Sequence, residues 1–516
     1  MNGLPWLTLL TLTPLAGAIL IFLTTGRNRS AARAIAATAS VVALGLTLAL
    51  WDGFNTASGA LQFQERHAWI PALGVDYRVG IDGLGLLMLL LSAIVVVMSI
   101  ASSWGRNEHG PLYFALVLLV ETGLFGTFTA LNFVHWFLYW ELGLIPAFFL
   151  IRLWGGPKRA SASTQFLIYT MAGSVALLLA FLAIYLATGT FDFIELAQAA
   201  RSGQLALELA QKLQWSNWTA AHIADCIFWA AFLGFAVKIP IMPFHTWLPS
   251  AYAEAPSGTT MLLTGAMSKM GLYGLLRILV PIFPEQMQGA LTLLLWLAVA
   301  SLVVSAFVAW AQTDLKRIFA YSSVNHLGYC VLGVLVALKW TGGSLGAERA
   351  AALDGVLLQM FNHALTAAAL FWFIAILEKR SGGLRGLYDF GGLRKVAPVF
   401  CGLMGIAVFS SLGLPGLNGF PGEFLIFKGG FPLVTWATAL SVIGLLITAV
   451  FLLVVLERVF YGPVNERWRA LHDLSTGERM ALAPVVALMF VLGFYPQLVV
   501  GHVNSTVMQM VSNLRF

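Results

Sequence analysis

The sequence predicts an all-α fold, a polytopic membrane protein with about 14 transmembrane helices. Of its 516 residues, 59% are hydrophobic and only 10% are charged, and the mean hydropathy is +0.84. A soluble globular chain carries about 25% charged residues, so this composition excludes a soluble catalytic domain. Each span is expected to be a helix, because lipid cannot satisfy an exposed backbone.

Fourteen windows have the length and apolar character needed to cross a bilayer, which takes roughly 20 residues. They lie near residues 4–23, 34–51, 83–102, 112–131, 133–153, 164–187, 226–242, 259–279, 290–311, 318–338, 355–377, 398–427, 434–455 and 481–499. Two long connections, 52–82 and 189–225, are expected outside the membrane. Helical periodicity in the second predicts a helix that lies along the surface.

The basic residues divide unevenly between the two sets of loops. Eighteen fall on one side, Arg27 and Arg106 among them, and eight fall on the other, which includes Arg515. Lys and Arg accumulate on the cytoplasmic side of membrane proteins, so the side with 18 is predicted to be cytoplasmic. An even number of spans then places both termini outside. The net charge of +6 is explained by this bias and does not indicate nucleic-acid binding.

Two windows contain paired prolines at membrane depth, Pro240 with Pro243 and Pro415 with Pro421. Proline lacks the N–H that continues a helix, so both windows are predicted to be broken. A single proline-containing window would be explained equally well by an ordinary kinked membrane helix. These are the seventh and twelfth windows, and the odd spacing inverts the second copy. Paired inverted repeats with one discontinuous helix each are typical of secondary transporters.

The predicted organisation follows from these breaks. It comprises three N-terminal spans in residues 1–111, a first inverted five-helix repeat in 112–280, a second in 284–456, and a last span with its tail in 457–516.

Five ionisable residues fall far from either interface: Glu121, Glu141, Lys238, Lys269 and Glu423. A charge at the centre of a bilayer costs about 2.5–3.5 kcal/mol on insertion scales. These groups therefore need mutual pairing or wet surroundings. One interpretation is that they only hold helices together. The other is proton transfer, which we favour because apolar packing replaces a buried ion pair at little loss of stability.

For proton transfer, Glu141 and Lys238 are the predicted gating pair. Burial disfavours a charged ammonium and a neighbouring carboxylate favours it, so a change in their separation binds or releases a proton. Lys269 is predicted to relay the proton and Glu423 to be its terminal site. The bridging candidates are Ser322, Ser323, Asn325, His326, Gln359, Asn362, His363 and Thr366. Histidine is the natural carrier near neutral pH, although each histidine taken singly is as well explained as a satisfied core residue.

The sequence offers no ligands for an electron cofactor. Cys226, Cys330 and Cys401 are far apart in apolar stretches and form no CxxC motif. The nine histidines give no repeated pair at matching depths of the kind that a b-type haem requires. No cofactor is therefore predicted in this chain.

Several of these motifs resemble the antiporter-like membrane subunits of respiratory complex I, NADH:quinone oxidoreductase. The resemblance covers essentially the whole chain. It rests on FLYWELGLIPAFFLIRLWGG, VKIPIMPFHTWLPSAYAEAPSGTTMLLTGAMSKMGLYGLLR and DLKRIFAYSSVNHLGY. RVGIDGLG before the third span and Glu423 in GEFLIFKGG are similar to the M-type (mitochondrial subunit 4 type) branch. Sister chains and Mrp-type antiporters usually have Lys in place of Glu423.

The resemblance implies roles for the residues already singled out. Glu141 and Lys238 match the coupled glutamate–lysine pair, Lys269 the central lysine, and Glu423 the exit-side residue. His326 and His363 fall on the central hydrophilic axis, and Glu121 matches the fourth-helix glutamate of M-type chains.

The resemblance also implies partners and a location. The expected partners are L-type and N-type antiporter-like chains, small membrane chains and, through them, a hydrophilic redox arm. FMN, iron–sulfur clusters and quinone are expected in those partner subunits. The expected location is the bacterial inner membrane or an equivalent energy-transducing membrane.

Other functions remain open at this point. An Mrp-type cation/proton antiporter subunit would share the buried charges, although Glu423 argues against it. Subunits of ferredoxin:plastoquinone or hydrogenase-linked complexes carry the same motifs. A scaffold subunit with no ion path predicts that loss of Lys238 or Glu141 harms folding and spares pumping. A self-contained redox enzyme is nearly excluded by the missing ligands.

Overall fold

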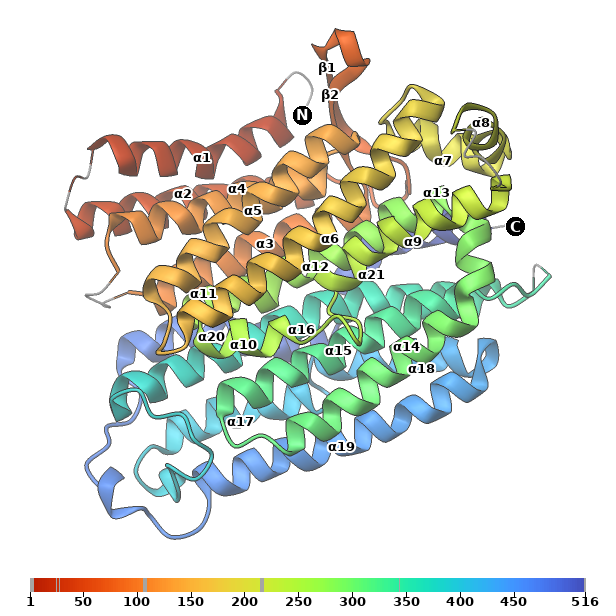
Figure 1. The fold of residues 1–516 in the computed structure, drawn as a ribbon. Helices are drawn as coiled ribbons and strands as arrows, with labels where there is room; N and C mark the ends of the chain where they lie inside the picture. The colour runs from red at the N-terminus through yellow and green to blue at the C-terminus, as the bar shows by residue number, and fades with distance from the viewer. Residues whose placement is uncertain are drawn as a thin grey trace.

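The computed structural model describes residues 4–24, 26, 28–104, 109–213, 218–342 and 344–514. Long helices lie side by side and make a bundle with one continuous apolar core (Figure 1). Arg27, Arg106 and Arg515, which entered the charge count, lie outside the described residues.

The chain begins with α1 (Trp6–Thr24) and α2 (Arg29–Asp52), followed by the hairpin β1 (Gln62–Ile70) and β2 (Val75–Ile81). The first half continues with α3 (Gly83–Ser102), α4 (Pro111–Thr129), α5 (Phe133–Trp154), α6 (Arg159–Thr188), α7 (Phe193–Arg201), α8 (Gln204–Leu213), α9 (Ala220–Lys238) and α10 (Trp247–Glu254). One further membrane segment then runs through α11 (Ser257–Leu262), the π-helix η2 (Leu263–Met267), α12 (Ser268–Gly274), the π-helix η3 (Leu275–Leu279) and α13 (Val280–Ile282).

The second half contains α14 (Pro284–Trp310), α15 (Leu315–Ala337), α16 (Gly346–Ser381), α17 (Pro398–Ser411), α18 (Gly419–Leu433), α19 (Thr435–Phe460), α20 (Thr476–Phe494) and α21 (Gln497–Asn513).

Twelve helices in the described part of the chain are long and apolar enough to cross a membrane. The prediction of a polytopic helical membrane fold is confirmed, but the count of 14 is not. Two of the predicted windows do not contain such a helix. The eighth window, 259–279, is interrupted by π-helical turns, and the twelfth window, 398–427, is divided into α17 and α18.

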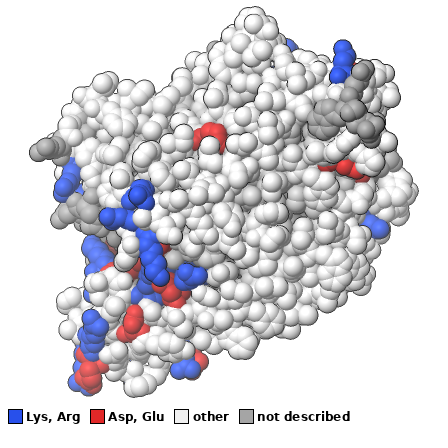
Figure 2. Space-filling view, viewed as in Figure 1, with Lys and Arg blue, Asp and Glu red and all other residues white. Residues whose placement is uncertain are grey.

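The two ends of the bundle differ. At one end, the hairpin end, lie β1, β2, α7 and α8, and α1 begins and α21 finishes there (Figure 1). At the other, the basic end, Lys316 pairs with Glu378 at 3.0 Å and Arg385 pairs with Asp314 at 2.6 Å. Charged side chains gather over this end, while the broad face beside it is almost free of charge (Figure 2). An uncharged belt of this kind suits contact with lipid.

The packing relates the two halves. Helix α4 packs on α5 as α14 packs on α15. Helix α6 packs on α9 and α10, the two parts of the first broken helix, as α16 packs on α17 and α18, the two parts of the second. Both predicted breaks occur, since α9 ends at Lys238 and α17 ends at Ser411. The exact repeat boundaries stay a prediction.

Three features differ from the sequence-based expectation. The connection 52–82 forms an antiparallel hairpin, with Gly74 at φ +62° in the turn, where glycine is favoured. One hairpin, with strands of nine and seven residues, is a weak signal beside the membrane windows. The last window, 481–499, runs across the gap between α20 and α21, where Tyr495 leaves the helical region before Pro496, as residues before proline tend to do. The single helix expected in 189–225 is divided into two helices, α7 and α8, at Gly203, whose φ is +73°.

Asp473→Ala should weaken the start of α17. The Asp473 carboxylate accepts hydrogen bonds from Val399 N and Phe400 N, both at 2.9 Å, and loss of such a cap costs about 1 kcal/mol. Burial opposes ionisation, but these backbone N–H groups outweigh it and hold the pKa of Asp473 below its ordinary value of 3.8.

A lowered folded-state pKa adds stability that is present above the ordinary pKa and is lost as the pH falls through the folded value. Thermal unfolding in detergent should therefore separate the Ala variant from the wild type at neutral pH, and less so below pH 3.8. Asp473→Asn, which keeps an acceptor oxygen, is the control. Equal stability of Asp473→Ala and the wild type at neutral pH would contradict this account of the cap.

Candidate functional site

The first helix break positions Lys238 at the end of α9. As predicted from Pro240, the Ala236 carbonyl loses its usual donor and accepts instead from Ile241 N at 2.9 Å. Trp247 Nε1 donates to the carbonyl of Val237 at 3.0 Å. The break is thus closed by polar contacts inside the protein, as non-helical backbone at membrane depth requires.

Lys238 lies buried beside an aromatic ring and a carboxylate. Its side chain is 4% exposed, and its Nζ lies 4.7 Å from the centroid of the Trp140 ring. Glu141 lies close enough to interact electrostatically with Lys238, and the Glu141 Oε1 atom is buried. Neither Lys238 Nζ nor Glu141 Oε1 has a hydrogen-bond partner among the described residues. The two groups are near each other without forming a closed ion pair.

Helix α12 passes close to Lys238 and carries the next lysine. Gly271 allows the approach, because a Cβ added there would lie 3.2 Å from the Lys238 Cβ. Lys269 is fully buried, two residues before Gly271. Its Nζ donates to the Thr264 carbonyl at 2.7 Å and lies 2.8 Å from His363 Nδ1. Single π-helical turns often mark functional sites, and here η2 and η3 flank α12 on both sides.

The histidines continue this arrangement into the second half. The His363 and His326 rings lie 5.1 Å apart between centroids. His326 Nδ1 is 3.0 Å from Glu423 Oε1, and its Nε2 is 3.1 Å from Ser411 Oγ. Gln359 Nε2 also donates to Glu423 Oε1 at 3.1 Å. Lys269, His363, His326 and Glu423 therefore form a buried file, called the central file below.

The second break is held by amides. Asn418 Nδ2 donates to the Asn362 carbonyl at 3.1 Å, and Asn362 Nδ2 donates back to the Asn418 carbonyl. The Thr366 and Ser410 hydroxyls lie 3.1 Å apart beside them. The side chains of Asn362, Thr366, Ser410 and Asn418 thus form a hydrogen-bonded knot. Helix α18 begins directly after Asn418 and carries Glu423 about one turn further on, so the knot fixes the position of the carboxylate.

Other predicted residues lie beside the central file. Glu121 is fully buried in α4 and accepts from Ser40 Oγ of α2 at 3.1 Å, and it makes no hydrogen bond to the described residues of the central file. Ser323 Oγ contacts Thr264 Oγ1 at 2.9 Å. Asn325 Nδ2 donates to the Leu302 carbonyl at 2.7 Å, a structural contact between α15 and α14. The sequence therefore assigned more polar residues to the file than the structure places there.

Sequence reasoning missed three supporting residues: Trp140, Ser411 and Asn418. Each stands next to a predicted feature, Trp140 beside Glu141 and the other two on either side of Pro415. Among the described residues, no group of three or more His, Cys, Asp or Glu is arranged to hold a metal ion.

The fold and the site define a class of protein: a polytopic membrane protein in which buried ionisable groups connect two broken helices. Residues 130–448 match the family described as NADH:quinone oxidoreductase/Mrp antiporter, TM. The chain belongs to this family.

Similar proteins support the same placement over the full length. NADH-quinone oxidoreductase subunit M of Rhodobacter capsulatus is 34% identical, over 98% of this chain and 96% of that protein. F(420)H(2) dehydrogenase subunit M of Methanosarcina mazei is also 34% identical, over 96% and 95%. A chain of respiratory complex I from Thermus thermophilus with bound NADH superposes with a TM-score of 0.83 at 27% identity, covering 99% of this chain and all of that one.

Asn418→Leu should destabilise the second break. The substitution removes the hydrogen bonds that the buried Asn418 amide makes with the Asn362 carbonyl and the Ser410 hydroxyl, and each such bond contributes about 0.5–1.5 kcal/mol. Thermal unfolding of the purified chain in detergent measures the loss. Thr438→Val, a buried change outside the knot, is the matched control, since its hydroxyl bonds only its own helix at Val434. Equal losses in the two variants would contradict a special role for Asn418.

Proposed function

We propose that the chain is a proton-translocating membrane subunit of a redox-driven NADH:quinone oxidoreductase. The observation that carries the proposal is the central file, which joins α12 to α18 through two histidines at membrane depth. Lys269 and His363 are at hydrogen-bond distance, as are His326 and Glu423, and the two histidine rings between them lie 5.1 Å apart. Histidine is the natural proton carrier near neutral pH, so this file can serve as a path for protons.

Within this proposal, each site residue has a role. Glu141 and Lys238 are the gate, because an ammonium without a hydrogen-bond partner beside a carboxylate changes its proton affinity when their separation changes. Lys269 passes the proton to His363 and His326, and Glu423 receives it beside the second break. Glu121, bonded to Ser40, tunes the field around α5 from the neighbouring helix.

The two halves act as inverted repeats over residues 112–280 and 284–456, flanked by 1–111 and 457–516. The basic end faces the cytoplasm and the hairpin end with both termini faces outward, because Lys and Arg concentrate on the cytoplasmic side. The membrane is a bacterial inner membrane or its equivalent.

The energy for translocation comes from partner subunits. The chain assembles with other complex I membrane subunits, L-type and N-type antiporter-like chains and small membrane chains, and through them with the hydrophilic redox arm. FMN, iron–sulfur clusters and quinone belong to those partners. An Mrp-type antiporter role is disfavoured because Glu423 replaces the lysine usual there.

Copurification tests the assembly. The tagged chain, extracted in mild detergent, should bring flavin and iron–sulfur subunits that mass spectrometry identifies, with NADH-driven quinone reduction. Ferredoxin-dependent reduction would move the proposal to a ferredoxin:plastoquinone complex. Small membrane subunits alone, with sodium/proton exchange, would replace it with a cation antiporter.

Lys238→Ala and Glu141→Gln test the gate. Each should abolish the proton translocation of this chain, because either change removes one partner of the coupled pair. The measurement is proton uptake or release per electron in proteoliposomes that contain the assembled complex. Lys428→Ala is the matched control, since this exposed lysine of α18 lies outside the central file. Normal pumping by an assembled Lys238→Ala complex would refute the gate.

A further inference from the structure

A cavity opens at the hairpin end and has no role in the path described above. It has a volume of about 630 Å³. Its wall includes Asp82, Leu276, Arg277, Val334 and Leu353, from four different membrane segments. The amides of Gln64, Gln198, Gln509 and Asn513 line it further. A roomy cavity with polar walls holds water.

An ion pair lies at the cavity wall. Arg277 NH2 contacts Asp82 Oδ1, and the two side chains are 16% and 5% exposed. Asp82 also caps α3 by accepting from Gly85 N at 3.1 Å. The Arg277 guanidinium lies 5.7 Å from the centroid of the Tyr273 ring, and Tyr273 Oη donates to the Phe128 carbonyl at 3.1 Å.

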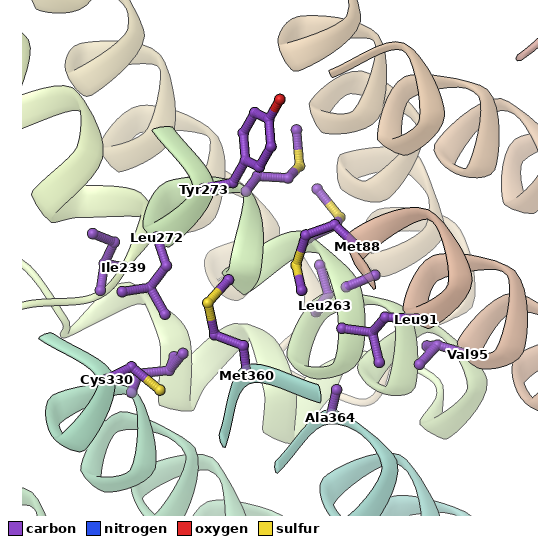
Figure 3. Close-up of a cluster of buried hydrophobic side chains, with 14 of the residues drawn as sticks. Met88, Leu91, Val95, Ile239, Leu263, Leu272, Tyr273, Cys330, Met360 and Ala364 are labelled. Carbon is purple, nitrogen blue, oxygen red and sulfur yellow. The ribbon is translucent and has the colours of Figure 1, made fainter. Parts of the chain in front are cut away.

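An apolar layer separates the cavity from the central file. We define it by Met88 of α3, Leu272 of α12, Cys330 of α15 and Met360 of α16, which belong to one buried cluster (Figure 3). Each of these residues is farther from the hairpin end than the residue of its own segment that lines the cavity. The separations along the chain are four to seven residues, for the pairs Met88 and Asp82, Leu272 and Leu276, Cys330 and Val334, and Met360 and Leu353. At 1.5 Å per residue, this is roughly 6–10 Å.

The central file begins directly behind this layer. Lys269 lies three residues deeper than Leu272, and His363 lies three residues deeper than Met360. The hydrogen bond between them, at 2.8 Å, therefore sits about one helical turn from the layer. Lys269, Tyr273 and Arg277 are spaced at i, i+4 and i+8, so they follow one side of the segment from the file to the cavity wall.

We propose that the cavity is an outlet for the proton held by Lys269 and His363, closed at rest by the apolar layer as a hydrophobic gate. Hydrophobic constrictions gate by dewetting, so a proton passes only when water enters the layer. Two of its four members are methionines, whose flexible side chains repack easily. The π-helical turns η2 and η3 on both sides of α12 supply the backbone freedom.

The proton balance is simple. Lys269 gives up a proton through water to the Asp82 carboxylate, which releases it to the cavity, while Arg277 stays charged. This outlet deepens the proposed function and rests on it. It is a second exit, at the first half of the chain, beside the one through Glu423.

The native Cys330 is a built-in probe of the gate. It belongs to the layer and is 1% exposed. In the intact complex in nanodiscs, a charged thiol reagent should label Cys330 at least about tenfold faster during NADH-driven turnover than at rest, as expected for a gate that changes population. Mass spectrometry of this chain measures the labelling. Leu276→Cys, on the cavity wall, should be labelled at rest, and Ala298→Cys, fully buried in α14, should remain unlabelled.

A cavity-filling variant links the labelling to this route. Val334→Trp, one turn from Cys330 on the cavity side, should abolish the turnover-dependent labelling of Cys330, whereas Val304→Trp on the exposed face of α14 should not.

Asp82→Asn, which retains a capping oxygen, should lower the number of protons moved per electron, and Asp76→Asn on the hairpin should leave this number unchanged.

Equal labelling of Cys330 at rest and during turnover, or wild-type pumping by Asp82→Asn, would overturn the outlet. Either result leaves the proposed function standing if Lys238→Ala still fails to pump. Normal pumping by Lys238→Ala would instead refute the proposed function itself.

Discussion

The cost of burying charge in a membrane is the constraint on which this structure depends. Lys269 is fully buried, and nothing in lipid would satisfy its ammonium. The protein satisfies it with the Thr264 carbonyl and the His363 ring. Histidine can take up the proton that it is offered, so the contact that makes the lysine tolerable also makes it a donor. In the proposed function, the same atoms therefore satisfy the buried charge and transfer the proton.

The broken helices follow from the same constraint. A continuous helix consumes its own carbonyls and amides, which leaves little to hold a polar group at membrane depth. Proline residues interrupt α9 and the α17–α18 segment. Backbone carbonyls at the breaks accept hydrogen bonds from Trp247 in the first break and from Asn362 in the second. Lys238 and Glu423 stand at these two places. The breaks position the two ends of the proposed path, and α12, α15 and α16 lie between them.

Much of this arrangement could be predicted from the sequence, and the reason is physical. Charged residues in apolar windows are rare enough that each one, such as Lys238 or Glu423, singles itself out. Prolines at membrane depth likewise identify both breaks. The pairings could not be predicted, because Lys269 and His363 are 94 residues apart and their contact depends on how the helices pack. Three further features could not be predicted, because weak local signals or tertiary packing determine them: the hairpin, the division of the last window at Pro496, and the cavity at Asp82. The roles of the site residues remain proposals.

The proton-to-electron ratio of the complex carrying Lys269→Met tests the central claim most directly. Methionine fills a similar volume and carries no proton, so it interrupts the central file with little change in packing. The account predicts an assembled complex that still reduces quinone when the proton gradient is collapsed, with fewer protons moved per electron than in the wild type. A ratio equal to that of the wild type would contradict proton transfer through Lys269 and leave the buried file with a structural role only.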